Sequence, residues 1–386
     1  MPSLRTKKRI GFCLNEKKKR KLNFHIFEEL CRNRGYDVTN IDLSLPLCSQ
    51  GPFDLIIHKL SDLLVEAGQD LKSHHLVQRL QVYLEMHTHT IMLDPLPAMH
   101  TLLDRFQSYH LLRSLETHNQ GPNGIFTPPC VELVSIQSDV VTLVRNHLSY
   151  PIICKTRVAH GPQSHEMSLI FNDEGLHDVR PPCLLQSFIN HSATLYKVFV
   201  VGSQHFVVQR PSLRNFPLGE TDQTTIFFNS HDVSKAESCS HLSEPPPCIE
   251  LMQPSDKVVR YVVQRLQGAL GMSLFGVDLI IDTQTGRCVV IDVNAFPGYE
   301  GVPDFFPALL SHVEKLIGSA NKENEPTKEH SAEQIEIPAE RSVDLLTGMM
   351  TTDRWTTDAG QLEPYQKTIT SGSYFSMCSS TVSADW

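Results

Sequence analysis

The first hundred residues alternate short apolar runs with longer amphipathic ones. Apolar, strand-like runs occur at residues 9–15, 37–43, 53–60 and 90–99. The amphipathic stretches between and after them have helical periodicity and lie at residues 21–36, 61–88 and 101–117. Strands that alternate with helices are typical of a parallel sheet covered by helices. The pattern therefore predicts an α/β fold whose first domain, residues 1–118, contains a parallel sheet.

The pattern changes after a turn-rich segment at residues 119–129, which we take as a domain boundary. Beyond it, apolar runs follow one another with only short turns between them, at residues 151–159, 166–171, 182–190, 195–202 and 204–213. Short turns between strands favour an antiparallel sheet. This second region is predicted to span residues 119–318. The polar, aperiodic tail at 319–386 is predicted to be disordered.

A β-hairpin is predicted within residues 274–301, because two apolar runs there flank a Thr-Gly turn. If Asp282 pairs with Cys288, the same register places Asp278 directly opposite Asp292. The Cβ atoms of such a pair lie about 5 Å apart. The two carboxylates are therefore expected to face each other.

Asn294 is expected to join this carboxylate pair, since side chains alternate along a strand and Asn294 follows Asp292 by two residues. Two facing carboxylates in an apolar sheet repel each other and are costly to bury unless a cation neutralises them. Mg²⁺ prefers oxygen ligands and needs only one or two carboxylates. The simpler explanation for an isolated D-x-N motif is that an Asp at the end of a hairpin points to solvent. Here the opposed Asp278 and the bend at residues 296–301 favour a magnesium site instead.

Composition excludes several classes of protein. The chain has 386 residues, of which 40% are hydrophobic, so it is long enough for two folded domains. Its apolar runs, such as residues 274–281, are too short to cross a bilayer. The N-terminus lacks the apolar region of a secretory signal. We therefore expect a soluble, cytoplasmic protein with no membrane partner, and we expect a monomer.

A basic cluster, EKKKRK at residues 16–21, contrasts with the formal net charge of −9. It has three interpretations, which are a nuclear-import or nucleic-acid patch, a solvated helix start, and a binding site for a polyphosphate. The acidic net charge and the absence of interleaved aromatics argue against a nucleic-acid partner. Lys18 lies in a predicted strand-to-helix turn, and His58 and Lys59 end a predicted strand. Open α/β sheets bind ligands at such positions, which favours the polyphosphate.

Further residues of the second region could hold phosphates. Lys155 follows the apolar residues 151–154, the turn HGPQSH at residues 160–165 has two imidazoles, and Lys197 and Arg210 lie on successive strands. Each has an ordinary alternative as a solvated edge residue, a hairpin loop or a lone surface charge. The Walker, G-x-G-x-x-G and protein-kinase motifs are absent from the sequence. A nucleotide must therefore be held in another way.

Many short blocks, all in one order, resemble the family of inositol-tetrakisphosphate 1-kinases, also called inositol 1,3,4-trisphosphate 5/6-kinases. Within residues 8–315 they include LNEKKKRKLNF, DLIIHKL, LDPLPA, ICKTRVAHG, SHEM, QSFINH, LYKVFVVG, QRPSL, FFNSHDVSK, SLFGVDLII and IDVNAFPGYEGV. The resemblance implies an ATP-grasp fold, with an N-terminal Rossmann-like parallel-sheet domain and a mainly antiparallel nucleotide-binding region. It also implies Mg²⁺-dependent phosphate transfer from ATP to inositol 1,3,4-trisphosphate at position 5 or 6 and to inositol 3,4,5,6-tetrakisphosphate at position 1.

The resemblance also implies a role for individual residues. Those expected to contact ATP are Arg105, Lys155, Gln186, Ser187, Phe188, Ile189, Asn190, His191, Lys197, Ser212, Ser230 and Ser234. Those expected to contact the inositol phosphate are Lys18, Lys59, His165, Lys197, Arg210, Asn294 and Gly298. The implied magnesium ligands are Asp278, Asp292 and Asn294, in agreement with the hairpin argument. Lys155, Lys197 and Asp292 are expected to be catalytic.

Two other functions remain open at this point. An ATP-grasp ligase would join a carboxylate to an amine through an acyl phosphate, and a non-catalytic scaffold would bind the same ligands without turnover. The basic turn at Lys18 speaks against the ligase, because a ligase substrate has fewer charges to neutralise. The resemblance also implies reversibility, with phosphate exchange between inositol phosphates through bound ADP.

Overall fold

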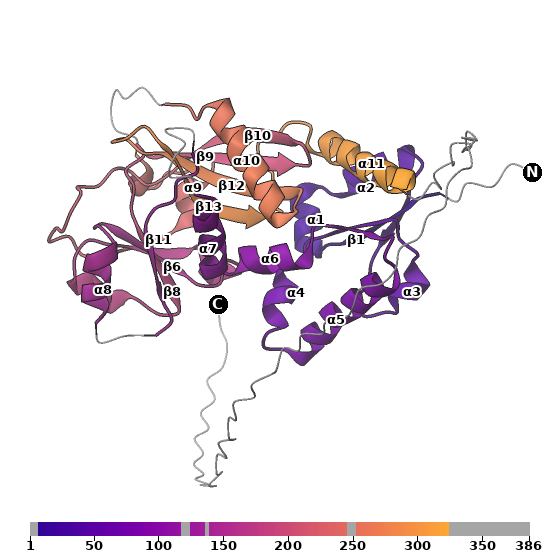
Figure 1. Cartoon of the computed structure of the whole chain (residues 1–386), viewed down its shortest axis with the longest axis horizontal. Helices are drawn as coiled ribbons and strands as arrows, with labels where there is room; N and C mark the ends of the chain where they lie inside the picture. Colours follow the sequence, from indigo (N-terminus) through magenta and orange to yellow (C-terminus); the bar gives the residue numbers. More distant parts are fainter. Residues whose placement is uncertain (1–6, 117–123, 136–138, 245–251, 324–386) are drawn as a thin grey trace, which may run out of the picture. The chain divides into compact units, whose positions relative to one another are not determined.

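The structure is a computed structural model of the chain, and it describes residues 7–116, 124–135, 139–244 and 252–323 (Figure 1). All of them belong to one compact unit, Met1–Thr327. The turn-rich boundary expected at 119–129 lies partly outside the described residues, as does most of the tail expected to be disordered. The described beginning of that tail continues the last helix, α11 (Phe305–Glu323).

Sheet I, formed by the N-terminal residues, is parallel, as the alternation of strands and helices predicts. Its strand order is β2-β1-β3-β4. The strands are β1 (Arg9–Cys13), β2 (Asp37–Asn40), β3 (Leu55–His58) and β4 (Ile91–Leu93). The helices of this part are α1 (Glu16–Leu22), α2 (His25–Asn33), α3 (Leu47–Gln50), α4 (Ser61–Glu66), α5 (Leu71–Met86), α6 (Leu96–Leu103) and α7 (Arg105–Leu115). The interior strand β3 is buried along its whole length, which explains its unbroken apolar run.

Three helices that we expected to be continuous are each broken in two. Asn23, with a positive φ of 53°, ends α1 before α2 begins. The side chain of Asp70 separates α4 from α5 by accepting a hydrogen bond from Ser73 N, and Asp104 separates α6 from α7 by accepting one from Phe106 N. Asp and Asn side chains satisfy the free amides at a helix start, so a new helix can begin at each of them. The apolar periodicity continues across these breaks and therefore hides them.

Sheet II is antiparallel, with the strand order β11-β7-β6-β8-β5. Its strands are β5 (Cys130–Leu133), β6 (Ile152–Thr156), β7 (Glu166–Ile170), β8 (Cys183–Ser187) and β11 (Ile226–Asn229). Three short helices belong to the same part, α8 (Val140–His147), η2 (Pro162–His165) and η3 (Glu174–Asp178). Val144 of α8 packs on Ile152 and Leu185 in a core from which water is excluded.

Sheet III is also antiparallel, with the strand order β10-β9-β12-β13. Its strands are β9 (Thr194–Val201), β10 (Gln204–Pro211), β12 (Leu274–Ile281) and β13 (Cys288–Ala295). The helices associated with it are α9 (Ser230–Ser234), η4 (His241–Ser243), α10 (Asp256–Leu270) and α11. The apolar stripe of α10, with Val259, Val262 and Leu266, shares a core with Val198 and Val277 of this sheet. The prediction of antiparallel sheet in the second region is therefore confirmed.

Buried groups join sheet III to the N-terminal residues. The carboxylate of Asp94, which follows β4, accepts hydrogen bonds from the backbone N–H groups of Ser273 and Leu274 at 2.7 and 2.8 Å. Phe306 of α11 stacks on Phe27 of α2, and the two helices lie side by side (Figure 1). These contacts fix sheet I next to the first residue of β12, the strand that carries Asp278.

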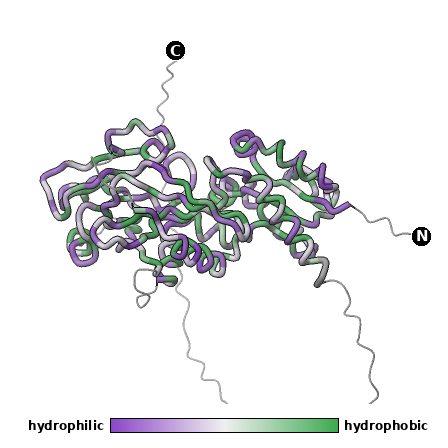
Figure 2. The backbone as a smooth tube through the Cα atoms, turned by 90° about the horizontal axis from the view of Figure 1, so that it is seen from above, coloured by the Kyte–Doolittle hydropathy of each residue, from purple (hydrophilic) through white to green (hydrophobic). Residues whose placement is uncertain are grey.

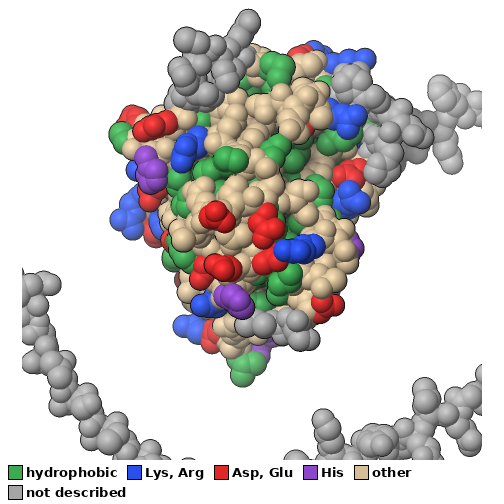
Figure 3. Space-filling model, turned by 90° about the vertical axis from the view of Figure 1, so that its left-hand side faces the viewer, with side chains coloured by type: hydrophobic (Ala, Val, Ile, Leu, Met, Phe, Trp, Pro, Cys, Tyr) green, Lys and Arg blue, Asp and Glu red, His purple; other side chains and the backbone are tan. Residues whose placement is uncertain are grey.

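The distribution of hydrophobic residues agrees with this arrangement. Many hydrophobic stretches run through the middle of the molecule, whereas many of its outer bends are hydrophilic (Figure 2). On the face shown in Figure 3, hydrophobic side chains occur in small groups among charged and neutral ones. Within the described ranges, no helix is both long enough and apolar enough to span a bilayer.

Candidate functional site

A row of polar side chains crosses one face of sheet III. Strand pairing places Lys197 of β9 opposite Asp278 of β12, and Asp278 opposite Asp292 of β13. Residues paired directly across antiparallel strands point to the same face, and Asn294, two residues after Asp292, shares that face. Lys197 Nζ donates hydrogen bonds to both carboxylate oxygens of Asp278, each at 2.9 Å. We call these four residues the polar row.

The hairpin register differs from the predicted one near its turn. The expected pairing of Asp282 with Cys288 is wrong, because Ile281 pairs with Cys288 instead. Farther along the hairpin the register shifts by one residue, with Ile291 as the extra residue of a β-bulge. This shift restores the predicted pairing of the two aspartates. Without the bulge, one of the two carboxylates would point to the opposite face of the sheet.

Burial makes Asp278 depend on its neighbours. Its side chain is 13% exposed. Burial raises the pKa of Asp278 above its ordinary value, Lys197 opposes this shift, and the negative charge of Asp292 adds to it. A further cation near the two carboxylates would therefore stabilise their charged forms.

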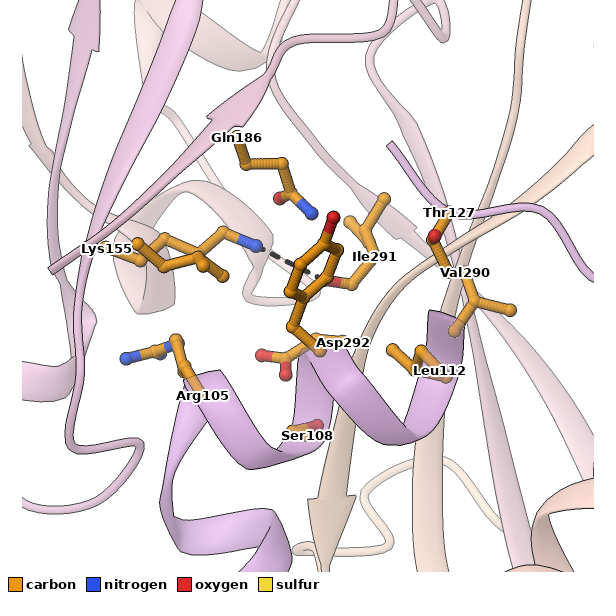
Figure 4. Close-up of a pocket in the computed structure, with 11 residues that line it drawn as sticks. Arg105, Ser108, Leu112, Thr127, Lys155, Gln186, Val290, Ile291 and Asp292 are labelled. Atoms are coloured by element: carbon orange, nitrogen blue, oxygen red, sulfur yellow. Dashed lines mark hydrogen bonds between the residues drawn. The ribbon is translucent and has the colours of Figure 1, made fainter. Parts of the chain in front are cut away.

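A pocket opens next to Asp292 and unites residues from α7, sheet II and sheet III (Figure 4). It is lined by Arg105, Ser108, Tyr109, Leu112, Thr127, Lys155, Leu184, Gln186, Val290, Ile291 and Asp292. Lys155 and Gln186 extend into it from sheet II, and Asp292 faces them from sheet III. The pocket therefore brings together Arg105, Lys155 and Gln186, which the resemblance assigns to ATP, and Asp292, which it assigns to magnesium.

Backbone carbonyls hold the two cations of this pocket in place. Lys155 Nζ donates to the carbonyl oxygen of Ile291 at 3.2 Å, which links sheets II and III. Arg105 Nη1 donates to the carbonyl oxygens of Thr156 and Val158 at 2.7 and 3.2 Å. Both cationic side chains are buried. Burial lowers the pKa of each, and the nearby charge of Asp292 opposes that shift.

The segment Gln186–His191 leads from sheet II to sheet III and is rigidly held. Asn190 donates a hydrogen bond to Phe216 O at 2.8 Å and accepts one from Phe216 N at 2.9 Å. His191 Nε2 lies 2.7 Å from Ser212 Oγ. Burial lowers the pKa of His191 to about 4, so this imidazole is neutral. We call Gln186–His191 the hinge segment.

The side chains of the hinge segment point in different directions. Ile189 packs with Leu195, Ile280 and Val289 in a small apolar cluster at one end of the polar row. Phe188 is buried. Ser187 Oγ accepts a hydrogen bond from Ser149 N at 3.0 Å, so the hydroxyl of Ser187 is already bound away from the pocket. The backbone of Ser187 therefore belongs to the hinge segment beside the pocket, whereas its hydroxyl binds Ser149 instead.

The two lysines expected at the inositol phosphate lie together at the end of β13. Lys18 Nζ donates to the carbonyl oxygens of Phe296 and Pro297 at 3.0 and 2.6 Å, and Lys59 Nζ donates to the carbonyl oxygen of Ala295. Burial, with the positive charge of Lys59 as a second cause, lowers the pKa of Lys18 to about 7. Burial lowers the pKa of Lys59 to about 8. Both lysines therefore titrate near neutral pH.

We had expected Lys18 to lie in the turn that precedes a helix, but it lies in the first turn of α1. Asn15 caps this helix, because its Oδ1 accepts a hydrogen bond from Lys18 N at 2.7 Å. The cap fixes the direction of α1 and therefore aims Lys18 at the end of β13.

Arg210 and Gly298 lie beside Glu300, just after β13. Arg210 shares a sheet face with Lys197, as expected, and its Nη2 donates to the carbonyl oxygen of Glu300 at 2.7 Å. A Cβ atom at Gly298 would collide with the carboxylate of Glu300, so the Glu300 side chain would have to move away from its present position. The Glu300 carboxylate itself pairs with Lys21 at 2.7 Å.

His165 ends η2 and lies close to α9. Its Nδ1 is 3.4 Å from Ser230 Oγ, and its ring centroid is 5.8 Å from that of His231. Partial burial and the charge of His231 hold the pKa of His165 below its ordinary value, and the charges of Asp292 and Lys197 also act on it. His165 is therefore near the polar row, whereas Ser234 lies at the far end of α9.

Comparison with known families decides what kind of protein carries this site. The chain matches the inositol 1,3,4-trisphosphate 5/6-kinase ATP-grasp domain over residues 119–315 and the pre-ATP-grasp domain of the same family over residues 9–99. The chain belongs to the inositol 1,3,4-trisphosphate 5/6-kinase family. The resemblance inferred from the sequence is confirmed, and the chain is a kinase.

Relatives from distant organisms are similar to most of this chain. Inositol-tetrakisphosphate 1-kinase of Xenopus laevis is 52% identical over 323 residues, which cover 82% of this chain and 81% of the relative. The enzyme of the same name from Danio rerio is 52% identical over 315 residues, which cover 80% and 79%. Inositol-tetrakisphosphate 1-kinase 3 of Oryza sativa subsp. indica is 32% identical over 313 residues, which cover 79% and 83%.

Solved structures confirm the ATP-grasp fold of this kinase. D-alanine–D-alanine ligase from Bacillus anthracis matches with a TM-score of 0.52 and covers 83% of this chain and 100% of the ligase. Only 12% of the residues are identical, so this likeness shows the fold alone. The prediction of an ATP-grasp fold is confirmed.

Several residues that line the pocket of this kinase were not expected from the sequence. They are Ser108, Tyr109, Leu112, Thr127, Leu184, Val290 and Ile291. A signal existed for those on α7, because Ser108, Tyr109 and Leu112 follow Arg105 at helical spacings of three, four and seven residues. No comparable signal existed on β13, because the bulge at Ile291 turns consecutive residues toward the pocket.

The donors at the end of the polar row suit Mg²⁺. Asp278, Asp292 and Asn294 offer two carboxylates and an amide, all oxygen ligands of a hard cation. Among the residues that the structure describes, no group of three or more His, Cys, Asp or Glu side chains could hold a metal. A set with only two carboxylates leaves coordination places for water and nucleotide phosphates, which is typical of Mg²⁺. The raised pKa of Asp278 is consistent with a pair that needs more positive charge.

Replacing Lys197 by Met is expected to destabilise the folded protein in a pH-dependent way. The free energy of unfolding should fall by about 2–3 kcal/mol at pH 7.5, because Asp278 loses its partner in a largely buried ion pair. The folded-state pKa of Asp278 lies above its ordinary value, so protonation relieves the unpaired charge. The loss should therefore shrink as the pH falls toward 5, as measured by urea unfolding. Lys235→Met, which breaks an exposed pair with Asp232, is the control. A loss of unfolding free energy that stayed the same at every pH would contradict this explanation.

Proposed function

We propose that this kinase transfers the γ-phosphoryl group of ATP to a ring hydroxyl of soluble inositol polyphosphates. The proposed acceptors are inositol 1,3,4-trisphosphate, at position 5 or 6, and inositol 3,4,5,6-tetrakisphosphate, at position 1. The reaction is Mg²⁺-dependent and reversible, with ADP-linked phosphate exchange, and the enzyme acts as a monomer in the cytoplasm. The observation that carries the proposal is the polar row, which lies between an apolar hinge and two partly buried lysines.

The hinge end of the polar row supports the binding of the nucleotide base. The cluster of Ile189, Leu195 and Ile280 is apolar, and the hinge segment is held by Asn190 and His191. Apolar walls with a few fixed polar groups are usual for small-ligand sites. The base and ribose would lie against the hinge segment and Ser212, and Ser230 and Ser234 of α9 would line the same side.

The centre of the polar row supports the binding of the ATP phosphates. Lys155 and Arg105 place buried positive charge beside Asp292. Arg105 Nε is buried and has no hydrogen-bond partner among the described residues. A buried donor without a partner is costly unless a ligand supplies an acceptor. A phosphate oxygen would supply one.

The far end of the polar row supports the binding of a polyanionic acceptor. Lys18 and Lys59 converge on the carbonyls of Ala295–Pro297, next to Asn294, although like charges repel each other. A ligand with several phosphates would favour the charged form of both lysines. His165, Arg210 and Gly298 complete the proposed contacts of the inositol phosphate.

Catalysis in this proposal depends on position and charge and requires no covalent intermediate. Phosphoryl transfer is accelerated mainly by alignment of the reactants and by stabilisation of the charge on the transferred group. Asp278, Asp292 and Asn294 would hold Mg²⁺, which when bound neutralises phosphate charge. Lys155, Lys197 and His165 would offset the charge that remains, and the hinge segment and the two lysines would keep the donor and the acceptor in line.

The full chain should phosphorylate inositol polyphosphates when incubated with labelled ATP and Mg²⁺. A panel of inositol phosphates, with positional analysis of the products, identifies the acceptor and the hydroxyl. Addition of ADP with a labelled product should cause isotope exchange into a second inositol phosphate, because the reverse reaction regenerates ATP in the site. Amide formation from carboxylates and amines, without phosphorylation of any inositol phosphate, would instead favour a ligase. ATP binding with no turnover on any acceptor would favour a scaffold.

Asp292→Asn should lower kcat by at least about 100-fold, because it removes a charge from the centre of the site. Asp282→Asn is a matched control on the same hairpin, since within the described part of the chain Asp282 binds only the turn residues Gln284, Thr285, Gly286 and Arg287. Circular dichroism and thermal unfolding should show that both variants are folded. A folded Asp292→Asn enzyme with near-normal kcat would refute the assigned role.

The KM for the inositol phosphate should rise as the pH is increased above about 7. Lys18 has its pKa lowered to about 7 and is charged mainly below that pH, and an anionic ligand favours the charged form. In Lys18→Met this titration is lost, so the ratio of mutant to wild-type KM should fall by about tenfold between pH 6.5 and 8.5. Lys17→Met, an exposed neighbour on α1, should keep a ratio near one at every pH. A constant ratio for Lys18→Met would contradict the proposed contact.

A further inference from the structure

The segment Arg157–His165, which we call the site loop, is anchored at its base by α7 and the residues before it. Arg105 N donates to Arg157 O at 2.8 Å, and Ala159 N donates to Leu103 O at 2.9 Å. Farther along the loop, Arg105 Nη2 donates to Ser164 O at 3.0 Å. The base and the end of the site loop are thus fixed by the same arginine that lines the pocket.

The tip of the site loop is held by a different part of the chain. His160 Nε2 lies 2.5 Å from Asp62 Oδ1, and because a carboxylate can only accept, Nε2 is the donor. The other oxygen of Asp62 accepts a hydrogen bond from Asn15 Nδ2 at 2.5 Å. Asp62 lies in the first turn of α4, three residues after Lys59. One carboxylate therefore connects the site loop to the N-terminal part of the chain.

Asn15 extends this connection to Lys18. Its Nδ2 donates to Asp62, while its Oδ1 accepts from Lys18 N at 2.7 Å and caps α1. At the opposite end, the site loop leads through Gly161 to His165. Gly161 has a φ of 87° and nothing within 4 Å of a Cβ atom placed there, so the loop has open space on that side. The contact with Asp62 ties the tip of the loop to the N-terminal part of the chain.

We propose that Asp62 is a positioning residue that joins the cap of the helix carrying Lys18 to the site loop carrying His165. The hydrogen-bonded series from Asn15 through Asp62 to His160, which we call the Asp62 bridge, sets the distance between the two sides of the acceptor site. Asp62 does not touch the reacting atoms in this role. The expected effect of Asp62 on the kinetics of the enzyme rests on the proposed function, whereas its expected effect on the site loop does not.

The chemistry of the bridge supports a positioning role more than a stabilising one. The side chains of His160 and Asp62 are 24% and 52% exposed, and exposed ion pairs contribute little to global stability. Asp62 nevertheless accepts from two segments that are 145 residues apart, as Asn15 and His160 are. A weak contact between distant segments that each carry a ligand-binding residue affects their spacing more than the overall fold.

Hydrogen exchange of the full chain, followed by mass spectrometry, tests the bridge without reference to activity. Asp62→Ala should increase the exchange of amides in residues 157–165 and at the start of α1, and leave the strands of sheet I unchanged. Glu85→Ala, which removes an exposed acid on α5, should change neither region. Unchanged exchange in the site loop would overturn the proposal. Faster exchange throughout sheet I would also overturn it, since that marks a general structural role.

Steady-state kinetics test the consequence for the acceptor site. Asp62→Ala should raise the KM for the inositol phosphate about three- to tenfold, in line with the net contribution of one ordinary hydrogen bond, and change kcat less than twofold. His160→Ala should have a similar effect, and the double variant should be no worse than Asp62→Ala alone, because both remove one bridge. Additive effects, or a fall in kcat at unchanged KM, would overturn the proposal. If the wild-type chain shows no kinase activity, the proposed function fails, while the exchange result still decides the bridge.

Discussion

The structure depends on the ion pair between Lys197 and Asp278 inside sheet III. Removing two charges from water is costly, and the cost is repaid only when geometry and further hydrogen bonds are good. Here the cation donates to both carboxylate oxygens at 2.9 Å, and the strand register leaves no other arrangement on that face. The next residue across the sheet, Asp292, adds a second negative charge that this cation does not fully offset. The site is therefore prepared for additional positive charge.

The other features of the site follow one another along the strands of sheet III, on either side of this pair. At the hinge end the sheet face is apolar, at its centre it carries opposite charges, and at its far end it meets Lys18 and Lys59. Sheet II brings Lys155 to the centre, and α7 brings Arg105. A donor nucleotide and an anionic acceptor could thus lie end to end along one rigid surface, which is the arrangement that phosphoryl transfer requires.

The rigid surface contrasts with the parts that close around it. Strands β9 and β12 of sheet III are mostly buried and the hinge segment is hydrogen-bonded, whereas the tip of the site loop is partly exposed and is held by Asp62. Loops with few buried contacts open at low cost in free energy, so substrates can enter and products can leave. The division between a fixed row of charges and a loosely held loop is a physical reason to expect reversible binding at both ends.

The sequence by itself predicted that Asp278 and Asp292 face each other, but it did not predict the bulge on which that facing depends. It determined most of the kinds of element and the parallel and antiparallel character of the sheets. These follow from local rules, since apolar periodicity sets helix and strand and alternation sets the face. Only the tertiary structure decided the bulge at Ile291, the breaks between helices, and the meeting of Lys18 and Lys59 at the end of β13. Each of these depends on contacts between residues that are far apart in the sequence or on a local backbone choice that several neighbours determine together. For the same reason the pairing of Asp62 with His160, 98 residues apart, could not be predicted from either segment alone.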